Sequence, residues 1–482
     1  MQFKRSLTVV VTAVFLTSSM TMASAVTSKG SRVLAMDVGP GENETLANAL
    51  DEAQSIGVTT IPVSVSWADI EPDYLDYQDP DNLFADLIDE LDGRGMSVIL
   101  NLRPIAGACR TLPEDLEARF ELPTSDPDHL DWDDAETQLR FEYLLDAVDI
   151  LADGLTIEQM TIGTEIDSHL DSATEYAAYK SFFEEARSDA QADFGSIPVG
   201  VATTWFALTA GDSESDWLLD LNENADRVMF TYYGIGGSPL SAKHPYNGPT
   251  ADIYDAILAI DGATETYGKD IDLIEVGYPS STAIGGSEAN QDVFVSTMFG
   301  IWDTYYPRIN TMVFNWQTDL TEQGSQWVSA GSWGGGSCPE AGGSAPDAPT
   351  APTVTPQGTT GSTTWSYWII AVNDHGQSYP GATGTTTTGN ATLSGSNFNQ
   401  ISWSAVTGAD SYLVMRQDVG SGENPGLIGT TTGTSFDDTG LDSTTWELAE
   451  FLRSIGFREF PDPVTNKDAW DELDYQAGLR GW

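Results

Sequence analysis

The sequence has 482 residues, of which 73 are Asp or Glu and only 20 are Lys or Arg, so its formal net charge is −53. A surface this acidic repels nucleic acid and anionic lipid, which excludes both as partners and disfavours a sulfated or uronic polymer as substrate. Dispersed acidic residues with few lysines favour work in high salt, where screening relieves self-repulsion; simple solubility is the alternative.

Residues 1–25 have the pattern of a secretory signal peptide. Lys4 and Arg5 precede an apolar run from Leu7 to Leu16, and the segment ends in ASA, which predicts cleavage after Ala25. Loss of the two basic residues takes the net charge from −53 to −55. The apolar run is too short to span a bilayer, and nothing else predicts a membrane anchor. We therefore expect a secreted, soluble protein, extracellular or periplasmic.

From residue 32 to about 317, short β-branched runs alternate with amphipathic stretches of helical length. This alternation predicts βα units around a parallel sheet. The expected strands lie at residues 32–38, 59–67, 96–104, 158–165, 197–205, 227–233, 271–278 and 309–316. Eight such strands predict a closed (β/α)8 (TIM) barrel of the α/β class, within residues 26–330.

Polar and aromatic residues gather where these strands end. In chain order they are Asp37, Trp67, Asn101 with Arg103, Glu165, Trp205, Tyr232 with Tyr233, Glu275, and Asn315 with Trp316. A (β/α)8 barrel carries its chemistry at the C-terminal ends of its strands, so we expect a functional site there. Asp37 is the exception, for which we expect a structural role.

The C-terminal third changes in character. A Gly, Ser and Pro-rich linker (331–345) precedes Thr and Gly-rich residues 346–442, whose short alternating strands predict an all-β sandwich. The stretch ISWSAVTGADSYLVMR (401–416) resembles fibronectin type III modules. Helix signals return in residues 443–482, which predicts that the β-module is inserted between strand eight and helix eight. The alternative is a barrel and module followed by a helical tail.

Two strand-end carboxylates, Glu165 on strand four and Glu275 on strand seven, define the chemical hypothesis. Strands three places apart bring their ends to opposite sides of a barrel mouth. Hydrolysis of a glycosidic bond needs such a pair, one carboxylic acid to protonate the leaving oxygen and one carboxylate to attack the anomeric carbon or activate water.

The motifs around these glutamates resemble those of the clan A glycoside hydrolases, retaining (β/α)8 enzymes. TIGTEID (161–167) is similar to their acid/base motif and IEVGYPS (274–280) to their nucleophile motif. FTYYG (230–234) resembles their sixth strand, FNWQTD (314–319) their eighth strand, and GFREFPDPVTNKDAWDEL (456–473) their closing helix region. Many members have Asn before the acid/base Glu, where this chain has Thr164, as certain β-mannanases do.

The resemblance implies a role for each matching residue. Glu275 is the expected nucleophile, Glu165 the acid/base, and Tyr232 or Tyr233 the phenol that hydrogen-bonds the nucleophile, since adjacent residues of a strand face opposite sides. Trp316 is the expected floor of the sugar site. The other expected substrate-binding residues are Trp67, Trp205, Asn101, Arg103, Thr164 and Asn315.

Histidine and cysteine patterns add little. The four histidines are scattered without metal-binding spacing, so we expect no metal and no cofactor. Cys109 follows strand three and Cys338 lies in the linker after strand eight, which places both on the active-site face. A disulfide between them and two unpaired thiols remain alternatives.

These observations predict a secreted, monomeric, retaining endo-β-glycosidase that acts on a neutral polysaccharide. The Gly-Thr-Glu motif favours β-mannan, while β-1,3-glucan and β-1,4-galactan remain open because the EVGYPS turn resembles those families too. Two alternatives remain: a non-catalytic carbohydrate-binding protein on a glycosidase-like barrel, and a cell-surface structural protein carrying such a barrel.

Overall fold

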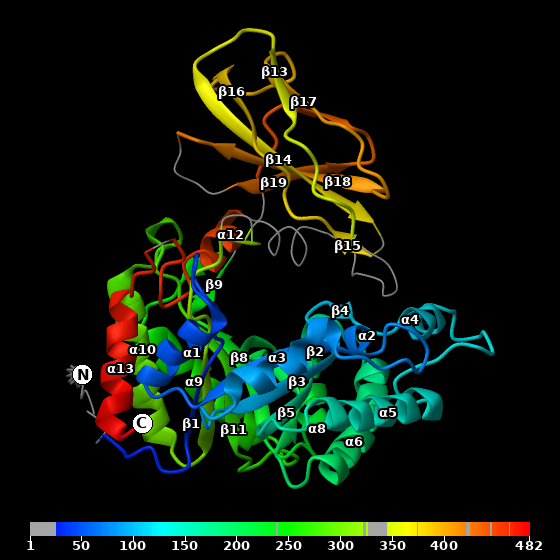
Figure 1. Cartoon of the computed structure of the whole chain (residues 1–482), viewed down its shortest axis with the longest axis vertical. Coiled ribbons are helices and arrows are strands. Elements are labelled where there is room, and N and C mark those ends of the chain that lie inside the picture. Colours follow the sequence, from blue (N-terminus) through cyan, green and yellow to red (C-terminus); the bar gives the residue numbers. More distant parts are fainter. Residues whose placement is uncertain are drawn as a thin grey trace, which may run out of the picture.

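The computed structural model contains a closed parallel barrel that carries a separate antiparallel β-module (Figure 1). The structure describes residues 26–237, 240–321, 324–325, 345–373, 375–420, 425–443, 446–461 and 463–482. The predicted signal peptide (1–25) and nearly all of the predicted linker (331–345) lie outside these residues. The predicted α/β class and TIM-barrel architecture are confirmed.

Each predicted strand forms, with bounds that differ by a few residues. The barrel strands are β1 (Val33–Met36), β2 (Thr60–Ser66), β3 (Ser97–Ala106), β5 (Ile157–Thr164), β6 (Val199–Gly200) with β7 (Ala202–Thr204), β8 (Val228–Tyr233), β11 (Ile271–Gly277) and β12 (Ile309–Phe314). Val201 interrupts the fifth strand between β6 and β7. The barrel closes because β1 pairs in parallel with both β2 and β12.

A helix layer surrounds the strands, with apolar side chains packed between the two layers. The outer helices are α1 (Leu46–Ser55), α3 (Leu83–Leu91), α5 (Ala135–Leu151), α6 (Ala173–Asp193), α8 (Ser213–Leu221), α9 (Asn247–Gly262), α10 (Glu288–Tyr305) and α13 (Asp468–Arg480). Helix α13 packs against α10. It therefore stands in the place of the eighth helix, after the β-module in the chain.

Short elements decorate the strand ends. They are α2 (Trp67–Ile70), β4 (Cys109–Arg110), α4 (Glu114–Phe120), α7 (Trp205–Thr209), β9 (Ile235–Gly236), β10 (Ser241–Ala242) and α12 (Trp446–Leu452), with 3-10 turns at Pro80–Asn82, Ile166–Ser168 and Thr282–Ile284. Most of them belong to the loops that surround the barrel mouth.

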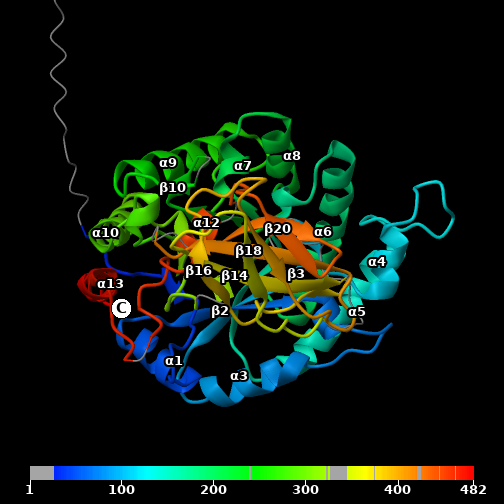
Figure 2. The same ribbon diagram turned by 90° about the horizontal axis from the view of Figure 1, so that it is seen from above.

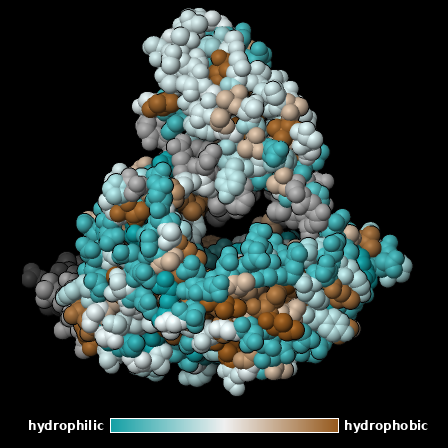
Figure 3. Space-filling view, viewed as in Figure 1, coloured by the Kyte–Doolittle hydropathy of each residue, from teal (hydrophilic) through white to brown (hydrophobic). Residues whose placement is uncertain are grey.

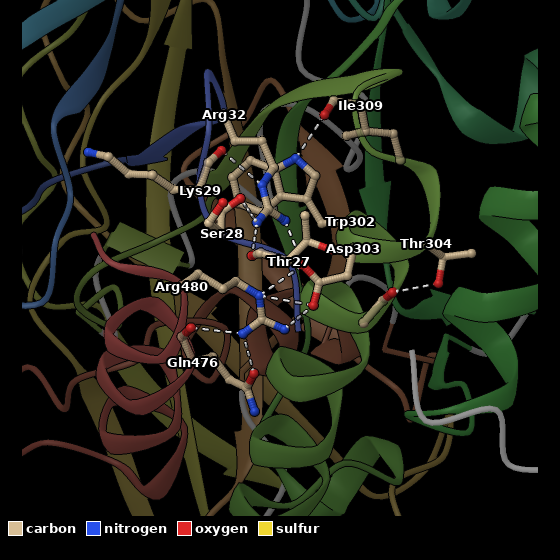
Figure 4. Close-up of polar contacts among 11 residues, drawn as sticks. Thr27, Ser28, Lys29, Arg32, Trp302, Asp303, Thr304, Ile309, Gln476 and Arg480 are labelled. Atoms are coloured by element: carbon tan, nitrogen blue, oxygen red, sulfur yellow. Dashed lines mark hydrogen bonds and ion pairs between the residues drawn. The ribbon is translucent and has the colours of Figure 1, made fainter. Parts of the chain in front are cut away.

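A buried ion network joins the start of the barrel to its last helix (Figure 4). Arg32, just before β1, donates to Asp303 of α10 over 2.8 Å, and Arg480 of α13 contacts the same carboxylate at 2.5 Å. All three side chains are at most 3% exposed. Removal of one partner would leave a buried charge uncompensated, so this network fixes α13 as the closing helix.

The β-module consists of two antiparallel sheets. One has the order β13-β17-β20, formed by Thr353–Gln357, Phe398–Ser402 and Ser435–Asp438. The other has the order β15-β14-β18-β19, with β16 also on β14, formed by Gly376–Gln377, Thr363–Asn373, Ser411–Asp418, Gly426–Thr431 and Gly384–Gly389. An apolar cluster lies between the sheets. The likeness to fibronectin type III modules stays a prediction.

The β-module lies over the mouth of the barrel. Figure 1 places it beyond one end of the barrel, and Figure 2 shows its strands in front of the ring of helices. Figure 3 shows a hollow between the module and the barrel, and hydrophilic residues over much of the visible barrel face. Within the described part of the chain, no helix combines the length and apolarity needed to cross a bilayer.

Candidate active site

A β-bulge in β11 turns Glu275 into the barrel mouth. Along β11 and β8, Leu273 pairs with Phe230 and Glu275 with Thr231, so β11 has one residue more than its neighbour at this point. The extra residue lets Ile274, which packs inside the barrel, and Glu275 face the interior consecutively. Strict alternation would have turned one of the two outward, into the helix layer.

Two side chains fix the Glu275 carboxylate. The Tyr233 hydroxyl donates to its Oε2 over 2.5 Å, and Asn315 Nδ2 donates to that hydroxyl over 3.2 Å. Burial raises the pKa of Glu275 to about 7, the charge of Asp37 adds to the rise, and the Tyr233 hydrogen bond and the Arg103 charge lower it. The Tyr233 hydrogen bond and the Arg103 charge stabilise the ionised carboxylate, as a nucleophile requires.

Glu165 follows β5 in a left-handed conformation, with φ +50°. Such a backbone costs a non-glycine residue of the order of 1 kcal/mol and persists where the surroundings enforce it. Thr231 Oγ1 donates to its Oε1 over 2.7 Å. Burial and the charge of Glu275 raise the pKa of Glu165 to about 7, against the lowering effect of Thr231.

The two glutamates are not equivalent. The two carboxyl groups repel each other mutually, but the Tyr233 hydroxyl and the charge of Arg103 both favour the ionised form of Glu275, whereas Glu165 accepts a hydrogen bond from Thr231 beside that charge. This environment favours Glu275 as the ionised carboxylate and Glu165 as the group that carries the proton. This division is the one that an acid and a nucleophile sharing a site require.

A third carboxyl group, Asp37, lies beside the pair after β1. The Trp316 side chain hydrogen-bonds Asp37, and burial raises the pKa of Asp37 to about 6 while Trp316 and the charge of Arg103 lower it. Arg103 lies close enough to Glu275, Asp69 and Asp37 for their charges to act on its guanidinium group. Arg103 thus lies near Glu275, Asn315 reaches Glu275 through Tyr233, and Trp316 lies beside Asp37.

The segment after the β-module forms one wall of the site. Phe451 of α12 meets the Tyr233 ring edge-on, with ring centroids 5.4 Å apart, and Trp316 packs against the same apolar cluster. Helix α12 also contacts β19 of the module. The module is therefore joined through α12 to Tyr233, whose hydroxyl hydrogen-bonds Glu275.

Three predicted substrate contacts are corrected by the structure. Trp67 is 1% exposed, begins α2, packs on aromatic rings of the helix layer and donates to Glu71 over 2.7 Å. Tyr232 is fully buried on the outer side of β8, where its hydroxyl donates to Asp252. Asn101 lies deeper in the barrel, where Ser64 and Thr161 occupy its amide.

Other predicted residues remain open. Trp205 is half-buried, and Lys243 Nζ lies 4.0 Å from its ring centroid, so an ammonium covers one face of this tryptophan. Thr164 precedes Glu165, and its buried hydroxyl has no hydrogen-bond partner. Cys109 is disulfide-bonded, while Cys338 lies outside the described residues, and their predicted pairing stays a prediction.

One residue of the candidate site was not predicted from the sequence. Thr231, which hydrogen-bonds Glu165, lies two positions before Tyr233 on β8, so both side chains face the barrel mouth. Among the described residues, no group of three or more His, Cys, Asp or Glu side chains is arranged to hold a metal ion.

No protein-family model and no curated protein match the sequence. Among solved structures, a GH5_18 protein of Bifidobacterium longum in complex with Manβ1-4GlcNAc is similar at 10% identity, over 60% of this chain and 70% of that one, with a TM-score of 0.44. An exo-β-1,4-mannosidase of an Opitutaceae bacterium shares 13% identity over 60% and 52% of the chains, with a TM-score of 0.43. The β-glycosidase of Thermosphaera aggregans shares 15% over 57% and 76%, with a TM-score of 0.42.

Proposed function

We propose that the protein is a retaining glycoside hydrolase that cleaves a neutral β-linked polysaccharide, with Glu275 as nucleophile and Glu165 as acid/base. The observation that carries this proposal is the unequal pair at the ends of β5 and β11. The Tyr233 phenol and the charge of Arg103 favour the ionised form of Glu275, while Glu165 is buried beside that charge, which favours its protonated form.

The proposed reaction has two displacements at the anomeric carbon. In the first, Glu275 attacks that carbon and forms a glycosyl ester, while Glu165 gives its proton to the departing glycosidic oxygen. In the second, the Glu165 carboxylate removes a proton from water, whose oxygen attacks the same carbon and releases Glu275. Loss of the Glu275 charge in the ester lowers the pKa of Glu165, which suits its change from acid to base.

The charges of the site support a neutral substrate. The carboxylates of Asp37 and Glu275 outnumber Arg103, the cation that acts on both of them. A uronic or sulfated sugar would meet repulsion here and from the acidic surface as a whole. Within the neutral polymers, β-mannan, β-1,3-glucan and β-1,4-galactan are the candidates, and we propose export through the predicted signal peptide.

The test is release of reducing sugar from mannan, galactan, laminarin-type glucan and mixed-linkage glucan, at low and high salt. Glu275→Gln is run beside the wild type, with Glu158→Gln, an exposed residue at the far end of β5, as matched control. Cleavage of one polymer that is lost in Glu275→Gln and kept in Glu158→Gln supports the proposal. A folded wild type that cleaves none favours the carbohydrate-binding alternative, which binding to a glycan array would then test.

A further inference from the structure

Asp37 combines three properties that a structural residue rarely has. It follows β1 on the inner side of the barrel, two residues beyond Ala35, whose side chain packs with Ile99 and Val313 inside the barrel. Its charge acts on the nucleophile Glu275. Its hydrogen-bonding neighbour is Trp316, the residue expected to form the floor of the sugar site.

Most of the hydrogen-bond acceptor positions of the Asp37 carboxylate have no donor from the described residues. A carboxylate offers about four acceptor positions, and the indole of Trp316 supplies one donor. The ion pairs described around the mouth join Arg458 to Glu44 and Lys467 to Asp319, and Asp37 belongs to neither. An acceptor of this strength on the inner side of the barrel, beside the two glutamates, calls for a hydroxyl or amide donor from a ligand.

Nearby polar atoms are unpartnered as well. Arg103 Nε, Thr164 Oγ1 and Asn315 Oδ1 are all buried without a hydrogen-bond partner. Buried polar groups are nearly always paired, and these three, with Asp37, surround the catalytic carboxylates. The Asp37 carboxylate and Asn315 Oδ1 are acceptors, Arg103 Nε is a donor, and the Thr164 hydroxyl can be either. This mixture matches the hydroxyl groups of a neutral sugar ring, which both donate and accept hydrogen bonds.

We propose that Asp37 binds substrate directly, its carboxylate accepting a hydrogen bond from a ring hydroxyl of the sugar that stacks on Trp316. This inference rests on the proposed function and deepens it by naming a specificity-determining residue. It replaces the expectation from the sequence that Asp37 is structural. The competing explanation is that Asp37 only orients the Trp316 indole.

The experiment uses 4-nitrophenyl β-glycosides of mannose, glucose and galactose, and then the monodeoxy analogues of the sugar that the full-length wild type cleaves. Wild type, Asp37→Ala, Asp37→Asn and Trp316→Phe are compared by kcat/KM. Trp316→Phe keeps an aromatic floor and removes the indole donor, so it isolates the orienting role. Asp37→Asn keeps the shape of the side chain in case the alanine variant does not fold.

The expected result is coupling between Asp37 and one hydroxyl. From the strength of hydrogen bonds to charged groups, we expect the kcat/KM of the wild type to be about 10- to 100-fold lower on one deoxy analogue than on the parent sugar. The kcat/KM of Asp37→Ala on the parent sugar should be lower than that of the wild type by a similar factor. For Asp37→Ala, the kcat/KM values on that analogue and on the parent sugar should differ by no more than about twofold. Equal losses for wild type and Asp37→Ala on each analogue, or a Trp316→Phe variant that reproduces the loss of Asp37→Ala, would overturn the inference.

Failure of the proposed function looks different. Cleavage of a parent glycoside by wild type but not by Glu275→Gln supports the hydrolase whatever Asp37 does. If the wild type cleaves a polymer but no monoglycoside, the same comparison is made on 4-nitrophenyl oligosaccharides of that polymer. A wild type that cleaves neither the aryl glycosides nor any of the polymers refutes the hydrolase and this inference together.

Discussion

Removal of the Tyr233 hydroxyl should impair the nucleophile in a specific, pH-dependent way. The hydroxyl donates to Glu275 over 2.5 Å and lowers the pKa of that carboxyl. A hydrogen bond to a charged group contributes about 1.5–3 kcal/mol, so Tyr233→Phe should lower kcat/KM by about 10- to 150-fold. The pKa of Glu275 rises in the variant, and because Glu275 must be ionised to attack, the acidic limb of the pH profile moves to higher pH.

The chain provides a matched control at the next position. Tyr232 has the same hydroxyl, but it donates to Asp252 on the outer side of β8. Tyr232→Phe should therefore leave the pH profile of kcat/KM in place. The assay is kcat/KM on a soluble aryl glycoside between about pH 4 and pH 9, which brackets the pKa values near 7 of both glutamates. An unmoved acidic limb in Tyr233→Phe, or equal shifts in both variants, would refute the assigned roles.

Three further outcomes are expected. Glu165→Ala should abolish cleavage of natural glycans yet keep formation of the glycosyl ester from substrates with activated leaving groups, so that added azide restores turnover; no rescue would contradict the acid/base role. Trp67→Phe removes the donor to buried Glu71 and should cost about 1–3 kcal/mol of unfolding free energy with KM unchanged, measured by denaturant titration and kinetics; a raised KM would restore the sugar-contact prediction. Burial, and after it the charges of neighbouring acidic groups, raise the pKa of Asp189 to about 6. Asp189→Asn should therefore raise the Tm at low salt, and the part of this gain that comes from repulsion should shrink near 1 M salt, where the Debye length is about 3 Å; a salt-independent Tm difference would exclude repulsion as a cause.

The barrel and the positions of Glu165 and Glu275 at its mouth were predictable because they follow from periodic signals. Runs of β-branched residues mark strands whatever the details of their packing, and a carboxylate at the end of such a run marks the mouth of a parallel barrel. Glu165 and Glu275 meet these conditions without knowledge of any contact. The closing helix was predictable because a barrel of eight strands needs an eighth helix, and only residues beyond the β-module carry a helical pattern.

Side-chain direction at the strand ends was harder to predict. Trp67 ends a β-branched run, but its neighbours form a short helix that turns the indole into the helix layer. The bulge in β11 shifts the alternation of side-chain direction by one residue just before Glu275, and no residue type in the sequence indicates the bulge. The choice between Tyr232 and Tyr233 depends on strand register, which the sequence leaves uncertain by more than one position.

Hydrogen-bond partners were beyond prediction for a related reason. Thr231 and Asp37 come from strands far from Glu165 and Trp316 in the sequence, and only the closed barrel brings them together. A strand-end Asp reads equally well as a capping group, a structural acceptor or a ligand contact. Its neighbours across the barrel decide between these roles, and they are known only once the register of the strands is known.

The most direct test of the account is to trap the glycosyl-enzyme with a 2-deoxy-2-fluoro glycosyl fluoride of the sugar that the protein cleaves, and to map the modified peptide by mass spectrometry. The account predicts one label per chain, on Glu275, and no label in Glu275→Gln. A label on another residue, or steady turnover of the natural substrate with inversion at the anomeric carbon, would contradict it.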